Sequence, residues 1–206
     1  MKERGMIFNG EMVRAILDGR KTQTRRPIKW KQTRFTEMAE RDDGSLWPWA
    51  EDCERGGDIW FTCPFGEVGD LIWVRETFGW QIRRDPLGGT GEFRVYRATT
   101  PDAVRYQTAS GEVAPIKWIP SIHMPRWASR ITLEITDVRV ERLNAISEED
   151  AQAEGVQPAC YEITPPEAAY RVSFGEVWRG IYGEESWVAN PWVWVIEFKR
   201  VEGGAA

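Results

Sequence analysis

Apolar residues recur along the chain with the spacings of short strands and short helices. Residues 6–8 are an apolar run that predicts a strand, and an apolar stripe of helical period follows Asn9, whose side chain is suited to cap a helix. Gly19 comes where a helix often ends with a residue of left-handed conformation. We therefore expect a helix from Asn9 to Asp18, then extended backbone, because threonines and Pro27 disfavour helix.

Alternation of apolar and polar residues marks the strongest strand candidates. Residues 71–74 and 93–98 have the composition of strands, and apolar residues alternate through residues 192–198. In residues 130–143 the alternation changes parity at Thr136. A change of parity predicts a bulge or a break, as strongly bent strands require.

Two further helices are expected in the last third of the chain. Residues 147–150 have the form of a capping box, so a short helix should begin there and end at Gly155. Between residues 170 and 181 apolar residues recur at helical spacing, which predicts an amphipathic helix that ends near Gly183. We assign its aromatic side chains to core packing: Tyr170, Phe174 and Trp178.

The remaining stretches lack a clear period and predict connections. Residues 36–66 contain scattered glycines and prolines, which indicates an irregular insertion rather than a separate domain. Residues 86–91 and 99–111 are expected to be loops. Separated strands with short helices between them predict one α+β domain over residues 1–206, built as a small, mostly antiparallel barrel with helices packed outside.

Composition narrows the class of protein. The chain has 206 residues, twelve tryptophans and a net charge of −5, which argues against a protein that coats nucleic acid through charge alone. No apolar run is long enough for a membrane helix, and the charged N-terminus predicts no signal peptide. Three cysteines do not suggest a disulfide framework, so we expect a reducing cytoplasm.

Positive charge is concentrated in one segment that starts with the residues "GRKTQTRRPI". Between residues 19 and 36 there are seven basic residues and no acidic one. They are Arg20, Lys21, Arg25, Arg26, Lys29, Lys31 and Arg34. Such a cluster can focus an anionic ligand onto one spot. Charge alone favours the alternative, a solvated basic loop.

Four segments share their order with the elements of one known domain. The first is the pattern "GRKTQTRR" of residues 19–26 after a short helix, and the second is "GDLIWV" of residues 69–74. The third is the bent strand and the "ISEEDAQAEG" helix of residues 131–155, and the fourth is the closing strand "WVWVIEFKRV". In this order they resemble the ASCH domain, a PUA-like barrel family linked to RNA. The whole chain looks most like the longer ASCH proteins of phages and prophages.

This resemblance implies a fold and a site. The fold is a PUA-like small β-barrel with flanking helices and surface insertions near residues 36–66 and 99–120. Thr24 stands where the broad ASCH pattern tends to have glutamate, and threonine there is similar to the small bacterial N4-acetylcytidine amidohydrolases. The catalytic lysine, threonine and glutamate of those enzymes correspond here to Lys21, Thr24 and Glu154. The chain is much longer than those enzymes, so the resemblance leaves the size of the substrate open.

The chemistry of these three residues is consistent with amide hydrolysis. A threonine hydroxyl becomes a nucleophile when an adjacent group takes its proton, and a lysine can do so if burial or nearby cations lower its pKa. Glu154 could carry that proton to the leaving amine. Its predicted place at a helix C-terminus opposes the helix dipole, although an exposed surface glutamate explains this position equally well. Lys21 and Thr24 can converge only if Lys21 lies in a turn after Gly19, because odd spacing separates them in a flat strand.

Other candidate residues have weaker support. Cys53, Cys63, Cys160 and His123 are the possible soft-metal ligands, but none of them has the spacing of a zinc site, so we expect no metal. Around residue 127 a tryptophan lies between arginines, which suits stacking on a base and contact with phosphate. Closure of one end of a barrel explains that tryptophan equally well. The substrate or RNA contacts expected on these grounds are Arg20, Arg25, Arg26, Lys29, Arg126, Trp127 and Arg130.

Two functions follow from these observations. The first is an amidohydrolase for N4-acylated cytosine nucleosides, with a Lys21–Thr24–Glu154 site and no cofactor. The second is an RNA-binding module, or a ribonuclease, that uses the same basic cleft. Either function predicts a nucleoside or RNA ligand, no membrane and no obligate protein partner. Either also predicts that the three catalytic candidates and Arg26 share one cleft, with Trp127 or Arg130 at its edge.

Overall fold

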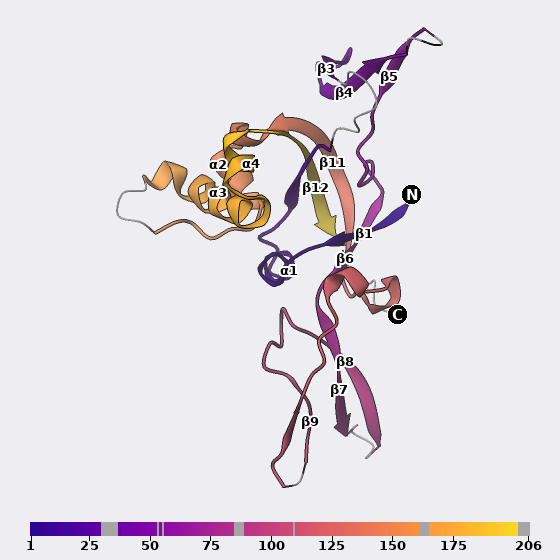
Figure 1. Ribbon diagram of the computed structural model, residues 1–206, viewed down its shortest axis with the longest axis vertical. Coiled ribbons are helices and arrows are strands. Elements are labelled where there is room, and N and C mark those ends of the chain that lie inside the picture. The colour runs from indigo at the N-terminus through magenta and orange to yellow at the C-terminus, as the bar shows by residue number, and fades with distance from the viewer. Residues whose placement is uncertain are drawn as a thin grey trace.

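A five-stranded sheet lies at the centre of the computed structural model (Figure 1). In sheet order its strands are β1 (Glu3–Ile7), β6 (Leu71–Arg75), β11 (Thr132–Arg142), β12 (Trp192–Arg200) and β2 (Gln23–Pro27). The β1–β6 pair is parallel and the other pairs are antiparallel. The structure describes residues 1–29, 37–52, 54, 56–84, 89–108, 110–160 and 165–201.

The two edge strands of this sheet are joined by a side chain. Among the strand pairs of the described residues, none links β1 to β2, so no closed barrel is formed by strand pairing there. Arg26 of β2 instead donates a hydrogen bond from Nη2 to the carbonyl of Ile7 at the end of β1, at 2.8 Å. Its guanidinium also lies 5.5 Å from the centre of the Phe8 ring. With several sheets and few helices, the architecture is mixed α+β.

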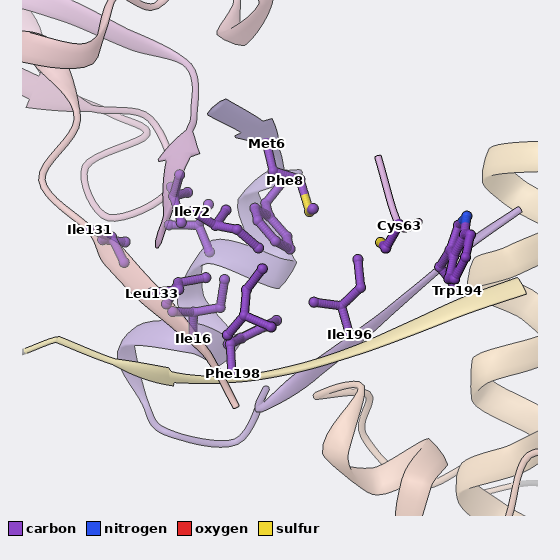
Figure 2. Close-up of a cluster of buried hydrophobic side chains, with 14 of the residues drawn as sticks. Met6, Phe8, Ile16, Cys63, Ile72, Ile131, Leu133, Trp194, Ile196 and Phe198 are labelled. Atoms are coloured by element: carbon purple, nitrogen blue, oxygen red, sulfur yellow. The ribbon is translucent and has the colours of Figure 1, made fainter. Parts of the chain in front are cut away.

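Strand β12 is buried on both faces, because different elements cover each of them. Trp194, Ile196 and Phe198 enter the core cluster shown in Figure 2, with side chains from β1, β6 and β11. Val193 and Val195 point to a second cluster, which α2 and α3 complete. The helices are α1 (Gly10–Leu17), α2 (Glu148–Ala153), α3 (Ala169–Tyr182) and α4 (Glu184–Val188). No helix in the described ranges has the length and apolar character needed to cross a bilayer.

The local signals of the sequence are confirmed where they concern caps and bulges. The side chain of Asn9 accepts a hydrogen bond from the backbone of Met12 at 2.8 Å, and Ser147 caps α2 in the same way. The ladder between β11 and β12 shifts register between Ile135 and Asp137, where the change of parity predicts a bulge. Each of these features depends on residues a few positions apart.

The prediction of an irregular insertion over residues 36–66 is wrong for most of the part described. Residues 37–60 form a three-stranded antiparallel sheet, which we call the β3–β5 arm, at one end of the molecule (Figure 1). Its strands are β3 (Glu37–Glu40), β4 (Leu46–Glu51) and β5 (Asp58–Trp60). The ring of Trp47 packs against Trp194 of the core, with centroids 5.4 Å apart. Pro48 and the surrounding glycines obscured this alternation of tryptophans in the sequence.

A second arm projects at the opposite end (Figure 1). Residues 75–130, the β7–β10 arm, contain two antiparallel pairs and two short helical turns. They are β7 (Phe78–Arg84), β8 (Thr90–Tyr96), β9 (Val104–Gln107), β10 (Val113–Pro115), η1 (Ser121–His123) and η2 (Arg126–Ala128). The prediction of a loop over residues 99–111 is therefore wrong at β9.

Outside the two arms, two further short helical turns are η3 (Leu143–Ala145) and η4 (Pro166–Ala168).

Candidate functional site

The basic segment begins in a turn that places Lys21 ahead of strand β2. Gly19 has a φ of +74°, a conformation that glycine adopts without strain. The backbone N–H groups of Arg20 and Lys21 both donate to the carbonyl of Ala15, at 2.9 and 3.0 Å. The chain thus stays folded back on α1 until it enters β2. The turn comprises Asp18 and Gly19, and Lys21 itself pairs with Glu154 as an isolated antiparallel β-bridge.

Lys21 lies against Glu154 in the interior. Its Nζ donates to Glu154 Oε2 at 2.6 Å and to the carbonyl of the same residue at 2.9 Å, and both residues are less than 10% exposed. Gly155 permits this approach, since its φ is +84° and a Cβ on it would lie 2.7 Å from the Cβ of Lys21. Two residues 133 positions apart in sequence therefore form one buried ion pair.

Burial changes the acid–base behaviour of this lysine. Removal from water lowers the pKa of Lys21 below its ordinary value, and this effect outweighs the attraction of Glu154, which acts in the opposite direction. Arg25 and Arg26 lower the pKa further by repulsion. Lys21 is therefore easier to deprotonate than a lysine in solution, as a general base must be.

Thr24 lies at the edge of a cleft of about 440 Å³. The cleft lies between α1, β2 and α3, and both Thr24 and Glu154 line it. Its other walls include Met12, Arg26, Phe174, Trp178 and Tyr182. Lys21 does not line the cleft itself, but it contacts Glu154, which does. Thr24 and Lys21, both within the described residues, share no hydrogen bond, although catalytic hydrogen bonds often tighten only when substrate binds.

Two basic residues of the segment, Lys21 and Arg25, are paired with carboxylates inside the protein. Arg25 is completely buried and contacts three carboxylates, those of Asp150 at 2.9 Å, Glu141 at 3.1 Å and Glu154 at 3.5 Å. Arg139 extends this layer, since it binds Glu141 and Asp150 as well. Sequence reasoning missed these acidic partners, because nothing in the local pattern relates them to the basic run.

The other basic residues of the segment have separate roles. Arg26 bridges to Ile7, and Arg20 binds the carbonyl of Gly155 at 2.7 Å and the carboxylate of Asp18 at 3.1 Å. Lys29 is exposed. Lys31 and Arg34 lie outside the described residues. Among the five residues of the segment that the structure describes, Arg20, Lys21 and Arg25 are paired with carboxylates, whereas Arg26 and Lys29 form no ion pair with another described residue.

Two buried donors in the cleft have no protein partner among the described residues. The Nε atoms of Arg25 and Arg26 are both buried, and neither makes a hydrogen bond there. Both side chains line the cleft. An unpaired buried N–H costs about 1–3 kcal/mol. The two side chains point to opposite faces of β2, since Arg25 lies at the ring of Phe174 and Arg26 at the ring of Phe8.

The structure does not bring the other predicted contact residues to this cleft. Arg126 binds Glu3, with its Nε 2.9 Å from Oε2. Arg130 makes a bidentate pair with the buried carboxylate of Glu76, at 2.8 and 3.0 Å. Trp127 lies on the β7–β10 arm. The expectation that Trp127 or Arg130 edges the catalytic cleft is thus corrected, because the buried Glu76 requires a cation and holds Arg130 in the arm.

The soft-metal candidates lie apart from one another. Cys63 is buried in the core, where burial raises the pKa of its thiol to about 11. Cys160 is exposed, His123 belongs to η1, and Cys53 lies outside the described residues. Within the described part of the chain, no three His, Cys, Asp or Glu side chains are grouped as metal ligands would be.

No family model matches this chain, and neither a curated protein nor a solved structure matches it. The resemblance to the ASCH domain therefore remains a prediction from the four sequence segments. The structure adds a physical reason for the second segment, "GDLIWV". Asp70 accepts hydrogen bonds from the backbone of Lys2 at 2.7 Å and from Arg4 at 3.0 Å, and so fastens β1 to β6.

Proposed function

We propose that the chain is an ASCH-type amidohydrolase for N4-acylated cytosine nucleosides, built on a PUA-like variant of the curved sheet. The observation that carries this proposal is the buried Lys21–Glu154 pair directly behind a cleft that Thr24 lines. Desolvation of a lysine next to a carboxylate supplies a base and a proton carrier, and Thr24 on the lining of the same cleft supplies a nucleophile.

In the proposed reaction, Thr24 attacks the acyl carbon of the substrate. Lys21, whose pKa is lowered by burial, takes the proton of the hydroxyl as the C–O bond forms. The tetrahedral oxyanion then needs hydrogen-bond donors that are already in place. Arg26, two residues after Thr24 in β2 and so on the same face of the strand, lines the cleft with it and is the candidate for this role.

Collapse of the intermediate breaks the C–N bond and releases cytidine. Glu154, which contacts Lys21 at 2.6 Å, passes the proton from the lysine to the departing amine. Water then hydrolyses the acyl-threonine ester, with Lys21 again as the base. The half-buried ring of Tyr182, supported by the buried Trp178 with centroids 4.4 Å apart, is a surface against which a planar base can pack.

The test is release of cytidine from N4-acetylcytidine by the purified protein. Lys21→Arg, Thr24→Val and Glu154→Gln should each remove most of the activity, and pairs of these changes should add little, because the residues act as a unit. Lys117→Ala is the control, since Lys117 is exposed on the β7–β10 arm and does not line the cleft. Full activity of the Thr24 variant would reject Thr24 as the nucleophile, and an inactive parent would reject the enzyme.

The RNA-binding alternative draws less support from this cleft. Arg25 and Lys21 are paired with carboxylates, so few charges remain for a phosphate backbone. If RNA were the ligand of the cleft, its affinity would depend on Arg20 and Lys29 and would fall steeply with salt. Such a dependence, without release of cytidine, would favour that alternative.

A further inference from the structure

A second cavity lies on the β7–β10 arm, away from the cleft. It has a volume of about 570 Å³ and is lined by Trp80, Glu92, Phe93, Arg94, Tyr96 and Trp127. We call this set the arm surface. The rings of Trp80 and Trp127 are 6.2 Å apart and inclined by only 30°. Two large rings, inclined by 30°, thus lie side by side in the arm surface, Trp127 exposed and Trp80 half-buried.

The exposed ring of the arm surface is held in place by the residues beneath it. Trp127 is 62% exposed, yet its carbonyl accepts a hydrogen bond from Arg94, and the next carbonyl, that of Ala128, accepts one from Tyr96 at 3.0 Å. A small core below, which includes Phe78 and Met124, fixes η2 against the hairpin. The backbone that carries Trp127 is therefore fixed, and its ring lies near Trp80 and Arg94, which reduces the entropy lost on binding.

Positive charge accompanies these rings. Arg94 lies over Trp127, with its guanidinium 5.7 Å from the ring centre, and Arg94 and Arg97 are both exposed. Among the ion pairs between described residues, none involves either of these arginines. Residues 75–130 hold nine Lys or Arg and five Asp or Glu, a net charge of +4, whereas the rest of the chain carries −9.

The β3–β5 arm shows that this charge is specific to one end of the molecule. It too displays tryptophans next to an arginine, since Arg41 lies 5.1 Å from the ring of Trp60. Residues 37–60, however, hold eight acidic and two basic residues, a net charge of −6. An anionic partner is therefore attracted to one arm and repelled by the other.

We propose that the arm surface binds a single-stranded nucleic acid. Stacking on exposed aromatic rings accepts any base, and adjacent arginines contact phosphate or stack on a base themselves. A duplex hides the faces of its bases, so the rings of Trp80 and Trp127 could not be used. This surface is separate from the proposed amidohydrolase site, and either proposal can fail without the other.

The experiment measures fluorescence anisotropy of a labelled single-stranded RNA of about 12 nucleotides, within the range that such surfaces cover. The DNA strand of the same sequence and the duplex serve as further probes. Trp127→Ala should weaken binding of the single strand about 5- to 150-fold, as loss of one stacked base does. Arg94→Gln should lower the slope of log affinity against log salt by about 0.7, the value for one phosphate contact.

Trp60→Ala is the matched control, because it removes a tryptophan beside an arginine from the acidic arm. It should leave binding unchanged. Binding of either single strand with this dependence supports the proposal, and the comparison of RNA with DNA identifies the sugar. The proposal is overturned if neither strand binds, if the duplex binds as tightly, or if Trp60→Ala weakens binding as much as Trp127→Ala. Since Trp127 is exposed, its variant should keep the parent's unfolding midpoint, which a urea titration verifies.

Discussion

The cleft and the β7–β10 arm both place arginines next to aromatic rings, and they use them in opposite ways. In the cleft, Arg25 has no exposed side-chain surface, contacts three carboxylates and lies 5.9 Å from the ring of Phe174. In the arm, Arg94 is exposed, makes no ion pair with another described residue and lies over Trp127. The same pair of residue types thus belongs to the interior in one region and faces solvent in the other.

The difference teaches that carboxylate partners, rather than the number of basic residues, decide what a basic segment can bind. A buried guanidinium requires neutralisation, because an unpaired charge in the interior is costly. The acidic residues that neutralise Arg25 lie 116 to 129 positions further along the chain. In the arm, Arg94 and Arg97 are exposed and form no ion pair with another described residue, so their charge remains available to a ligand.

Replacing a tryptophan in each region should give the largest contrast in stability. Trp178 in the cleft wall is 2% exposed, so Trp178→Ala should lower the free energy of unfolding by about 3–5 kcal/mol. Trp127→Ala, at an exposed ring, should change it by less than about 0.5 kcal/mol. Urea titrations of both variants measure this contrast. Equal losses would mean that the arm ring is part of the folded core.

Removing a carboxylate from each region should separate buried from exposed ion pairs. Glu154→Ala leaves Lys21 buried without its partner and should cost about 3–5 kcal/mol of stability. Glu92→Ala in the arm breaks an exposed pair with Arg105, at 3.7 Å, and should cost at most about 1 kcal/mol. The double change Lys21→Met with Glu154→Leu should recover part of the loss, because no lone charge remains. A double change as harmful as the sum would contradict this account.

Two glycines with the same backbone conformation test how close the packing is. Gly155 and Gly111 have φ values of +84° and +87°, so alanine strains either of them by about 1–2 kcal/mol. At Gly155 the added carbon would also lie 2.7 Å from Lys21 Cβ, whereas at Gly111 it meets nothing within 4 Å. Gly155→Ala should therefore cost about 1–3 kcal/mol more than Gly111→Ala in thermal or urea unfolding. Identical costs would show that the Lys21–Gly155 approach is loose.

The smallest effect expected is the dependence of stability on alkaline pH. Burial lowers the pKa of Lys21 in the folded protein below its value of 10.5 in the unfolded chain. At any pH between these two pKa values, the unfolded chain binds more protons than the folded protein. Stability should then rise with pH in that window, by at most about 1.4 kcal/mol per pH unit, and Lys21→Met should remove the rise. Unfolding midpoints between neutral and alkaline pH measure it, with the exposed Lys117→Met as the control from the arm. A parent protein with a flat profile would contradict a lowered pKa.

The sequence by itself determined the features that depend on neighbouring residues. Asn9 and Ser147 cap their helices, Gly19 ends α1, and the change of parity at Thr136 becomes a bulge, because each involves only a few adjacent positions. The strand over residues 192–200 also follows from local alternation. These elements were predictable since the backbone geometry of a few residues is set by steric and hydrogen-bonding preferences within the segment.

Only the tertiary structure decided which of the basic residues are free. The contact between Lys21 and Glu154 was anticipated through the family resemblance, but the pairing of Arg25 with Asp150 and Glu141 was not. The sheet over residues 37–60 and the placement of Trp127 on an arm were missed as well. Burial is a property of the packed chain, and an unpaired buried charge is costly. A buried arginine therefore needs acidic partners, and these can come from distant parts of the sequence. For this reason the local sequence does not decide where positive charge remains exposed.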